Sequence, residues 1–311
     1  MTSAFHVYFG PEAHAATPRV RRIGPDDCVS ALKEGLDDFF SMPTYPVFVG
    51  LFYAVAGIAL FAMTSFGNAL QLAFPLAAGF AILGPFVAIG LYEMSRRRER
   101  GLAVRSRDAL TIVRSPALPS ILAFGLILLA IFGAWIFAAE LIYVWLYGPN
   151  PPAAAIPFLQ DVLTTDRGWT LIVTGVLVGF CFAALALAIS VISFPLMLDR
   201  DVGLVPALEA SWRVTRANPL AVALWGLIVA VALVLGSLPL FFGLAVVLPV
   251  LGHATWRFYR KAIERDPAHE LPIEGPLHPD VTSNPALRLM WIFLDGLDYL
   301  RQRKEPTDRN A

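Results

Sequence analysis

The stretch that decides the fold carries no charged side chain from Ala217 to Trp256 and reads ANPLAVALWGLIVAVALVLGSLPLFFGLAVVLPVLGHATW. A helix needs about 20 mostly apolar residues to cross a hydrocarbon layer of about 30 Å, so this run is long enough for two spans. Positions 236–239, Gly-Ser-Leu-Pro, interrupt it near its middle, because glycine can end one helix and proline can begin the next. The run therefore predicts a pair of membrane-spanning helices.

Other uncharged runs extend this pattern over the chain. They are Phe39–Tyr92, Ser115–Ala139, Leu141–Gln160 and Gly168–Leu198. The first is too long for one helix and has turn-forming residues at 65–68, so we expect spans at about 45–64 and 70–92. Two more are expected at about 117–147 and 169–198. With 57% apolar and only 15% charged residues, the sequence predicts an all-α membrane protein with six transmembrane helices in three hairpins.

The positive charges orient these spans. If both termini are cytoplasmic, the inner side holds 23 of the 24 Lys and Arg residues, and the outer side holds only Arg167. Lys and Arg are retained on the cytoplasmic side during insertion, so this arrangement is strongly favoured. Aromatic residues near the span ends predict interfacial belts, with Tyr143, Trp145, Tyr147 and Trp169 outside and Tyr45, Tyr92, Trp256 and Tyr259 inside.

The chain divides into three regions. We expect a flexible cytoplasmic N-terminus over residues 1–25, a six-span membrane domain over 26–263 and a cytoplasmic tail over 264–311. The tail begins with a proline-rich linker and ends in an amphipathic segment, which is expected to lie on the inner leaflet or to dock a partner through residues 284–304. The bilayer itself is the other expected partner. Balanced charge gives no indication of nucleic-acid binding.

A threefold internal pattern runs through the membrane domain. A short amphipathic stretch precedes each hairpin, and in the first one Val29, Leu32, Leu36, Phe39 and Phe40 share a helical face. The second helix of each hairpin carries a proline, at Pro85, Pro195 and Pro249. If this is a true triplication, the repeats are parallel, related by an axis along the membrane normal. The alternative is that proline is simply common in membrane helices, because neighbouring groups can satisfy the freed carbonyl.

Few polar residues lie near the membrane, and each has two interpretations. Glu140 is an acid inside an apolar stretch. It either has a transport or protonation role, or it is an interfacial carboxylate that is paired or accessible to water. The cluster Asp199, Arg200 and Asp201 could bind a cation or a head group, or could cap helices where a span ends. His253 is either a ligand or an interfacial hydrogen-bonding group.

The densest charge cluster follows the second span. Glu93 can pair with Arg96 or Arg97 at helical spacing. The basic residues Arg96, Arg97, Arg98 and Arg100 are interpreted as topology anchors that face anionic lipid. A specific regulatory lipid site is the alternative.

No residue set predicts catalysis or a cofactor. The two cysteines, Cys28 and Cys181, are expected at different depths, and the histidines do not form a ligand cluster, so neither a disulfide nor a metal site is expected. No acid-base pair or activated nucleophile can be assembled at one depth. We therefore expect a protein that is not an enzyme.

Several segments resemble one known family. They are Pro18–Ile23, Ala31–Phe39, Gly84–Glu93 with Ser95–Arg97, Asp199–Gly203, Trp225–Leu240 and Gly252–Trp256. Together they resemble domain of unknown function family 2189, a bacterial group of integral membrane proteins, over most of residues 18–263. The resemblance implies a multi-pass protein of the bacterial inner (cytoplasmic) membrane without an established activity. Some relatives carry an oxidase-subunit description, but this chain lacks the histidines that such chemistry needs.

Two functions remain open from the sequence. The favoured one is a non-enzymatic scaffold, assembly factor or lipid-interacting component, because few polar groups are buried and amphipathic segments are abundant. The alternative is a transporter or channel for a small or lipidic solute, lined by Glu140 or by the cluster at 199–201.

Overall fold

The fold is known from a computed structural model, which describes residues 18–42, 70–72, 75–76, 84–152, 155–238, 243–273, 275 and 292. Within these residues the secondary structure is helical, and the β pairing consists of one isolated antiparallel bridge between Val20 and Ile263. The predicted all-α class is confirmed. The first predicted span, at 45–64, and the predicted amphipathic tail segment at 284–304 lie outside the described residues, except for Ile292.

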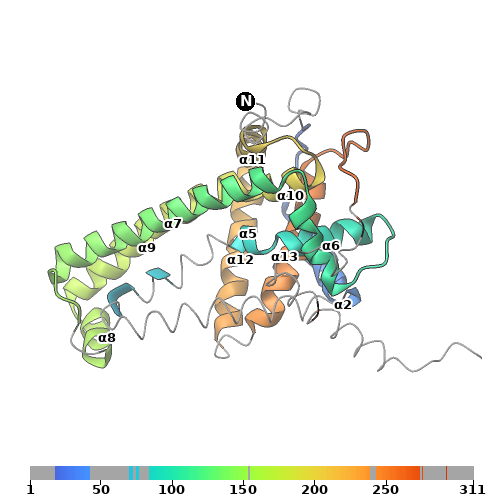
Figure 1. The fold of residues 1–311 in the computed structure, drawn as a ribbon. Coiled ribbons are helices and arrows are strands. Elements are labelled where there is room, and N and C mark those ends of the chain that lie inside the picture. Colours follow the sequence, from blue (N-terminus) through green and yellow to red (C-terminus); the bar gives the residue numbers. More distant parts are fainter. Residues whose placement is uncertain are drawn as a thin grey trace, which may run out of the picture.

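An arm with few charged residues forms one part of the molecule. Helices α7 (Leu118–Tyr147) and α9 (Asp166–Ser190) lie side by side in opposite directions, and α8 (Ala155–Thr164) joins them at the far end (Figure 1). Helix α7 ends at Gly148, whose φ of 87° is a conformation that glycine adopts without strain. After a short break α9 continues as α10 (Ser193–Asp199). These elements match the predicted third and fourth spans, whereas α8 was not predicted.

A second hairpin comes from the run that opened the sequence analysis. Helix α12 (Pro219–Ser237) begins with proline at its first position, where the missing N–H costs nothing. Helix α13 (Leu244–Ala262) returns beside it and contains Pro249. The rings of Trp225 and Phe258 stack between the two helices with centroids 4.8 Å apart. The break predicted at 236–239 agrees with the observed end of α12.

Three helices are long and apolar enough to cross a membrane, among the residues that the structure describes. They are Leu118–Tyr147, Asp166–Asp199 and Pro219–Ser237, with mean hydropathies of 2.5 to 2.6. Helix α13 is not in this set, because the half that follows Gly252 is polar. Of the second predicted span, only residues 70–72, 75–76 and 84–92 are described.

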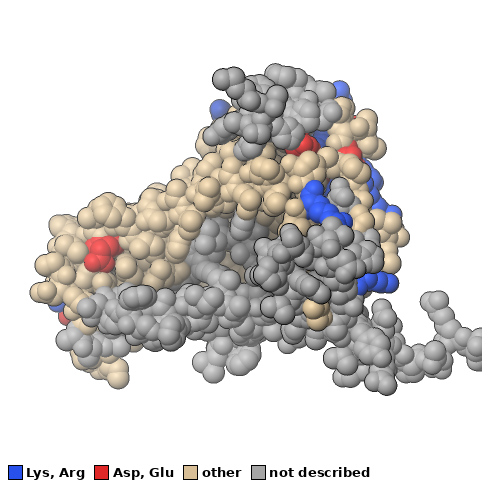
Figure 2. All heavy atoms as spheres, in the orientation of Figure 1, with Lys and Arg blue, Asp and Glu red and all other residues tan. Residues whose placement is uncertain are grey.

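The hairpins meet at what we call the charged end, where α2 (Pro25–Ser41), α6 (Ile89–Glu99), the 3-10 helix η3 (Ser106–Arg114), α10, α11 (Leu204–Ala217) and the second half of α13 pack together. The short helix α5 (Gly84–Val87) leads into α6. Figure 2 shows the contrast: Lys and Arg gather at this end, and the arm is almost free of them.

The packing at the charged end repeats three times. Helices α6, α10 and α13, the second members of the predicted hairpins, all contact one another. The amphipathic element η3 packs on α6, and α11 packs on α10. Helix α2 packs on α13, the last of the three. The amphipathic elements η3 and α11 therefore each pack on the second helix of the preceding hairpin, and α2 packs on the second helix of the last hairpin.

The contact between α2 and α13 is the closest of these. A Cβ atom on Gly35 would lie 2.5 Å from the backbone and side chain of Ala254, so only glycine allows the two helices to approach this far. The buried face of α2 consists of three small residues and one acid, Cys28, Ala31, Gly35 and Asp38. The predicted apolar face points outward: Val29, Leu36 and Phe40 are 45%, 42% and 71% exposed.

Two segments that flank the membrane domain are held against it. Residues 18–24 were predicted to belong to a flexible N-terminus, but Arg21 donates a hydrogen bond to the Ala262 carbonyl and Glu264 donates to that of Arg19. Residues 264–273, predicted as the start of a free linker, also fold back onto the charged end, where the Leu271 N–H donates to the Asp199 carbonyl at 2.7 Å. We call residues 264–273 the strap.

Candidate functional site

A buried carboxylate, Asp199, lies at the centre of the charged end. Its side chain has no exposed surface and accepts hydrogen bonds from both terminal nitrogens of Arg260, at 2.8 and 2.9 Å. The Tyr259 hydroxyl donates a third at 2.7 Å, and the Nε atom of Arg96 lies 3.8 Å away. Since Asp199, Arg260 and Arg96 come from α10, α13 and α6, the carboxylate joins all three second helices.

The Arg260 guanidinium is held on every side. Its Nε donates to the Glu99 carboxylate at 2.9 Å, and its carbon atom Cζ lies 4.8 Å from the centroid of the Trp256 ring. The Trp256 indole N–H donates to the same Glu99 oxygen at 3.0 Å. Trp256 and Tyr259, predicted for a lipid-facing belt, are both buried, as is Tyr92, and that prediction was wrong because their rings pack inside the protein.

A second group of ion pairs lies along α6. Glu93 accepts from Arg96 at 3.2 Å and from Arg97 at 2.9 Å, as their helical spacing predicted. Arg97 also donates to the Thr111 hydroxyl at 3.0 Å and lies 3.9 Å from the Asp108 carboxylate. Both acceptors belong to η3, so the α6 arginines bind the next amphipathic element.

These contacts correct the interpretation of the arginines as lipid-facing anchors. Arg96 and Arg97 are only 3% and 4% exposed and are bound to acids of the protein, so they do not face lipid. The side chains of Arg98 and Arg100 keep 31% and 22% of their surface, but each also binds carboxylates: Arg98 binds Asp37 and Asp38, and Arg100 binds Glu270. The acids that bury these arginines come from segments far apart in the sequence.

A third buried group joins α2, α6 and α13. Arg257 binds the Asp38 carboxylate through two hydrogen bonds, at 2.7 and 2.9 Å, and Arg98 binds it from the other side. The Ser95 hydroxyl donates to Asp38 at 2.9 Å and lies 2.7 Å from His253 Nδ1. Because a hydroxyl has one proton and a carboxylate only accepts, His253 Nδ1–H donates to Ser95. His253 is therefore a buried hydrogen-bonding group.

Arginine contacts fix the charge of Asp38. Burial alone would raise the pKa of this carboxyl, but the hydrogen bonds and charge of Arg257 and the hydrogen bonds from Arg98 and Ser95 lower it below its ordinary value of 3.8. Asp38 is therefore ionised at neutral pH, as the hydrogen-bond assignment at Ser95 requires.

The strap contributes a further carboxylate, Glu270, to the charged end. It accepts from Arg100 at 2.9 Å and from Arg265 at 2.7 Å, and Arg260 lies 3.6 Å away. Burial opposes the ionisation of Glu270, yet the hydrogen bond from Arg265 and the charges of the three arginines lower its pKa below 4.5. Sequence reasoning missed this group, because the strap reads as a polar linker.

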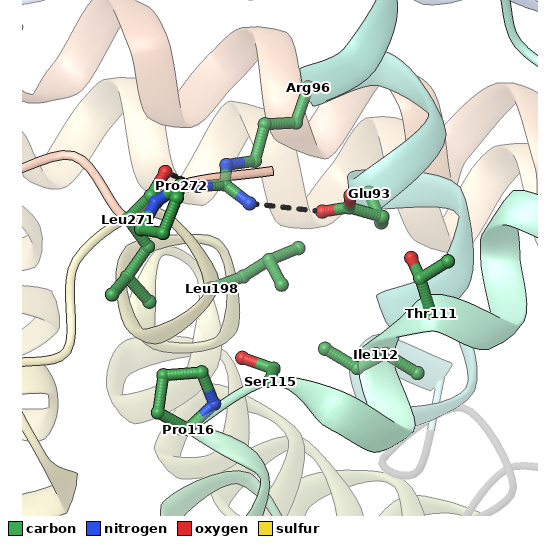
Figure 3. A pocket seen from close by; sticks show the side chains of 9 residues that line it. All are labelled: Glu93, Arg96, Thr111, Ile112, Ser115, Pro116, Leu198, Leu271 and Pro272. Atoms are coloured by element: carbon green, nitrogen blue, oxygen red, sulfur yellow. Dashed lines mark hydrogen bonds and ion pairs between the residues drawn. The ribbon is translucent and has the colours of Figure 1, made fainter. Parts of the chain in front are cut away.

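A small pocket lies between α6, η3, α10 and the strap (Figure 3). Its polar side is formed by Glu93, Arg96, Thr111 and Ser115, and its apolar side by Ile112, Pro116 and Leu198. Leu271 and Pro272 of the strap cover it, and the Leu271 carbonyl accepts a hydrogen bond from Arg96. Its volume of about 10 Å³ suits one water molecule.

The predicted site residues fall into two separate places. Asp199, Arg200, Asp201 and His253 are all buried at the charged end, where the Arg200 guanidinium donates to the Glu264 carbonyl at 2.5 Å. Glu140 lies in the second half of α7, far along the arm. There it accepts a weak hydrogen bond from Gln71, in η1 (Leu70–Leu72), at 3.4 Å.

Three described helices that could span a membrane, with ion pairs gathered at one end, are typical of an α-helical integral membrane protein. Residues 73–199 match the model of a family described as "Predicted integral membrane protein (DUF2189)". The family resemblance found in the sequence is confirmed over these residues, and the resembling segments within 18–39 and 225–256 lie outside the match. No curated protein and no solved structure matches the chain.

Proposed function

We propose that the protein is a non-enzymatic scaffold, assembly or lipid-interacting component of the bacterial inner membrane, with six spans and both termini in the cytoplasm. The observation that carries this proposal is the pairing of three buried acids with arginines. Asp38, Glu93 and Asp199, which could line a solute path, each bind arginines of the protein itself. Such contacts fix helices in place, and the adjoining pocket has room for about one water molecule.

The six-span arrangement is supported by the two described ends of the second predicted span. The Pro75 carbonyl accepts a hydrogen bond from the indole of Trp135 at 3.0 Å, and Gln71 contacts Glu140, so Gln71 and Pro75 lie beside the second half of α7. Ile89 begins α6 at the charged end. The two described ends therefore lie far apart along the arm, as the ends of a membrane span would.

The geometry around Ser95 supports the absence of catalysis. A serine nucleophile is activated by a base, usually a histidine, that accepts its proton. Here the Ser95 hydroxyl accepts from His253 and donates to the Asp38 carboxylate, a weaker base that is already bound by Arg98 and Arg257. The side chains of Ser95, His253 and Asp38 have no exposed surface, so a substrate could not reach the hydroxyl. The group instead ties α2 and α13 to α6.

Transport of a small or lipidic solute is the second candidate, and Glu140 is the residue that favours it. This carboxylate sits in an apolar helix, and the hydrogen bond that it accepts among the described residues comes from an amide, not a cation. An acid with so weak a partner at membrane depth is a natural proton or cation ligand. The other acids named above are better explained by their arginine contacts.

Two measurements distinguish these functions. The full-length protein and a variant without residues 284–304 are purified from native membranes after crosslinking, and a scaffold should lose a specific co-purified protein upon the deletion. In parallel, the intact protein and Glu140→Gln are reconstituted into vesicles for solute uptake. Uptake that depends on Glu140, with the co-purified set unchanged by the deletion, would refute the scaffold and support the transporter.

A further inference from the structure

The strap offers a binding function that goes beyond the scaffold proposal. We propose that the charged end holds a binding site for a phosphate-bearing anion, and that Glu270 and the Leu271 carbonyl of the strap occupy this site in the structure. The strap is thus a displaceable internal ligand, and its release opens the pocket of Figure 3.

Three arginines from separate elements converge on Glu270. Arg100 follows α6, Arg260 lies in α13 and Arg265 lies in the strap itself. The Glu270 side chain is 6% exposed and accepts hydrogen bonds from Arg100 and Arg265. Guanidinium groups bind carboxylate and phosphate oxygens with the same planar geometry, and Arg100 and Arg260, which stay in place when the strap leaves, therefore suit a phosphate.

Two arginines beside the strap have donors without a hydrogen-bond acceptor. Among the described residues, these donors are the buried Nε atoms of Arg96, which lies 3.8 Å from Asp199, and of Arg100. Arg96 is 3% exposed and gives one terminal nitrogen to Glu93 and the other to the Leu271 carbonyl. A phosphate group has more acceptor oxygens than the single carboxylate and the single carbonyl that these arginines now share.

Charge balance decides the kind of ligand. Arg100 has Glu270 as its carboxylate partner, so release of the strap leaves a partly buried guanidinium without its counter-charge, which is unfavourable. The replacement must bring at least one negative charge. A phosphodiester head group carries one, as Glu270 does, and free inorganic phosphate carries one to two.

The pocket beneath the strap fits the remainder of such a ligand. Leu271 and Pro272 form its cover, so displacement of Glu270 and Leu271 uncovers both its walls. Thr111 and Ser115 offer hydroxyls on one side, and Ile112 and Leu198 offer apolar surface on the other. This combination suits a polar head group attached to an apolar chain.

The test uses the full-length protein in nanodiscs, with hydrogen exchange of residues 264–273 as the readout of strap release. The discs contain phosphatidylcholine alone, phosphatidylcholine with phosphatidylglycerol, or phosphatidylcholine with inorganic phosphate in the buffer. Glu270→Gln weakens the internal ligand. Glu264→Gln removes the same charge from an exposed position of the strap and is the matched control.

We expect either anion to accelerate hydrogen exchange in the strap. The Glu270→Gln variant should bind that anion about tenfold more tightly than the Glu264→Gln control, because it lacks the Glu270 carboxylate that competes for the site. Adding Arg100→Gln to Glu270→Gln should abolish the gain. An effect of phosphatidylglycerol alone identifies a lipid head group, and an effect of inorganic phosphate identifies a soluble anion.

Unchanged strap exchange with both anions, in the unmodified protein and in Glu270→Gln, would overturn the proposal. If Glu270→Gln also loses protection in α7, the variant has unfolded, and the titration of the unmodified protein decides alone. Loss of the partner in the deletion experiment above would not affect this outcome, so the scaffold proposal and the anion site can fail separately.

Discussion

Replacement of Asp199 by asparagine is the most informative single change at the charged end. The substitution keeps the size of the side chain and removes its charge. The carboxylate is fully buried and accepts hydrogen bonds from Arg260 at 2.8 and 2.9 Å and from Tyr259 at 2.7 Å. Removing one partner of a buried ion pair costs about 3–5 kcal/mol, because the other charge stays buried without compensation. We therefore expect Asp199→Asn to lower the free energy of unfolding by about this amount.

The measurement is denaturant unfolding in mixed micelles, followed by tryptophan fluorescence. Glu209→Gln is the control, since the Glu209 side chain is 68% exposed and lies 3.9 Å from Arg213, an arrangement worth about 0–1 kcal/mol. If Asp199→Asn proves as harmless as Glu209→Gln, Asp199 is not a structural junction. A variant that folds normally yet loses solute uptake would support the transporter instead.

Two further predictions concern α2. Gly35→Ala should destabilise the protein by about 1–3 kcal/mol, since the added Cβ would lie 2.5 Å from Ala254, whereas Gly133→Ala, with nothing within 4 Å, should be neutral or stabilising in a thermal melt. The contacts with arginine that lower the pKa of Asp38 also stabilise the fold at pH values above about 4. This stabilisation is lost as the pH falls through the pKa of Asp38 in the folded protein. The stability difference between the unmodified protein and Asp38→Asn should therefore shrink in acid unfolding below pH 4, and a constant difference would contradict the role of Asp38.

The apolar helices were predictable because their signal is local. Helix α7 ends at Tyr147 as expected, since the apolar run stops there and Gly148 follows. The outer helix α8 was missed because its segment reads as the end of an uncharged loop. It is amphipathic instead, and Ile156, Leu159 and Leu163 are exposed on its surface.

The charged end was not predictable, because its contacts join distant segments. Arg96 reads as a membrane-surface anchor when only its neighbours in the sequence are considered. Its burial depends on Glu93, Asp199 and the Leu271 carbonyl, and the last two are supplied by α10 and the strap. Nothing in the local sequence around Arg96 specifies these distant acceptors. The sequence predicted which residues carry charge near the membrane and the local pairs of Glu93 with Arg96 and Arg97, but not the contacts between distant segments.

Labelling of single cysteines by a membrane-impermeant maleimide tests the membrane topology most directly. In a Cys181→Ser background, which retains only the buried Cys28, the exposed positions are probed as Gln160→Cys in α8 and Ala268→Cys in the strap. Three hairpins anchored in the cytoplasm predict that Gln160→Cys is labelled in intact spheroplasts and Ala268→Cys only after lysis. Labelling of both before lysis, or of Ala268→Cys alone, would contradict this topology.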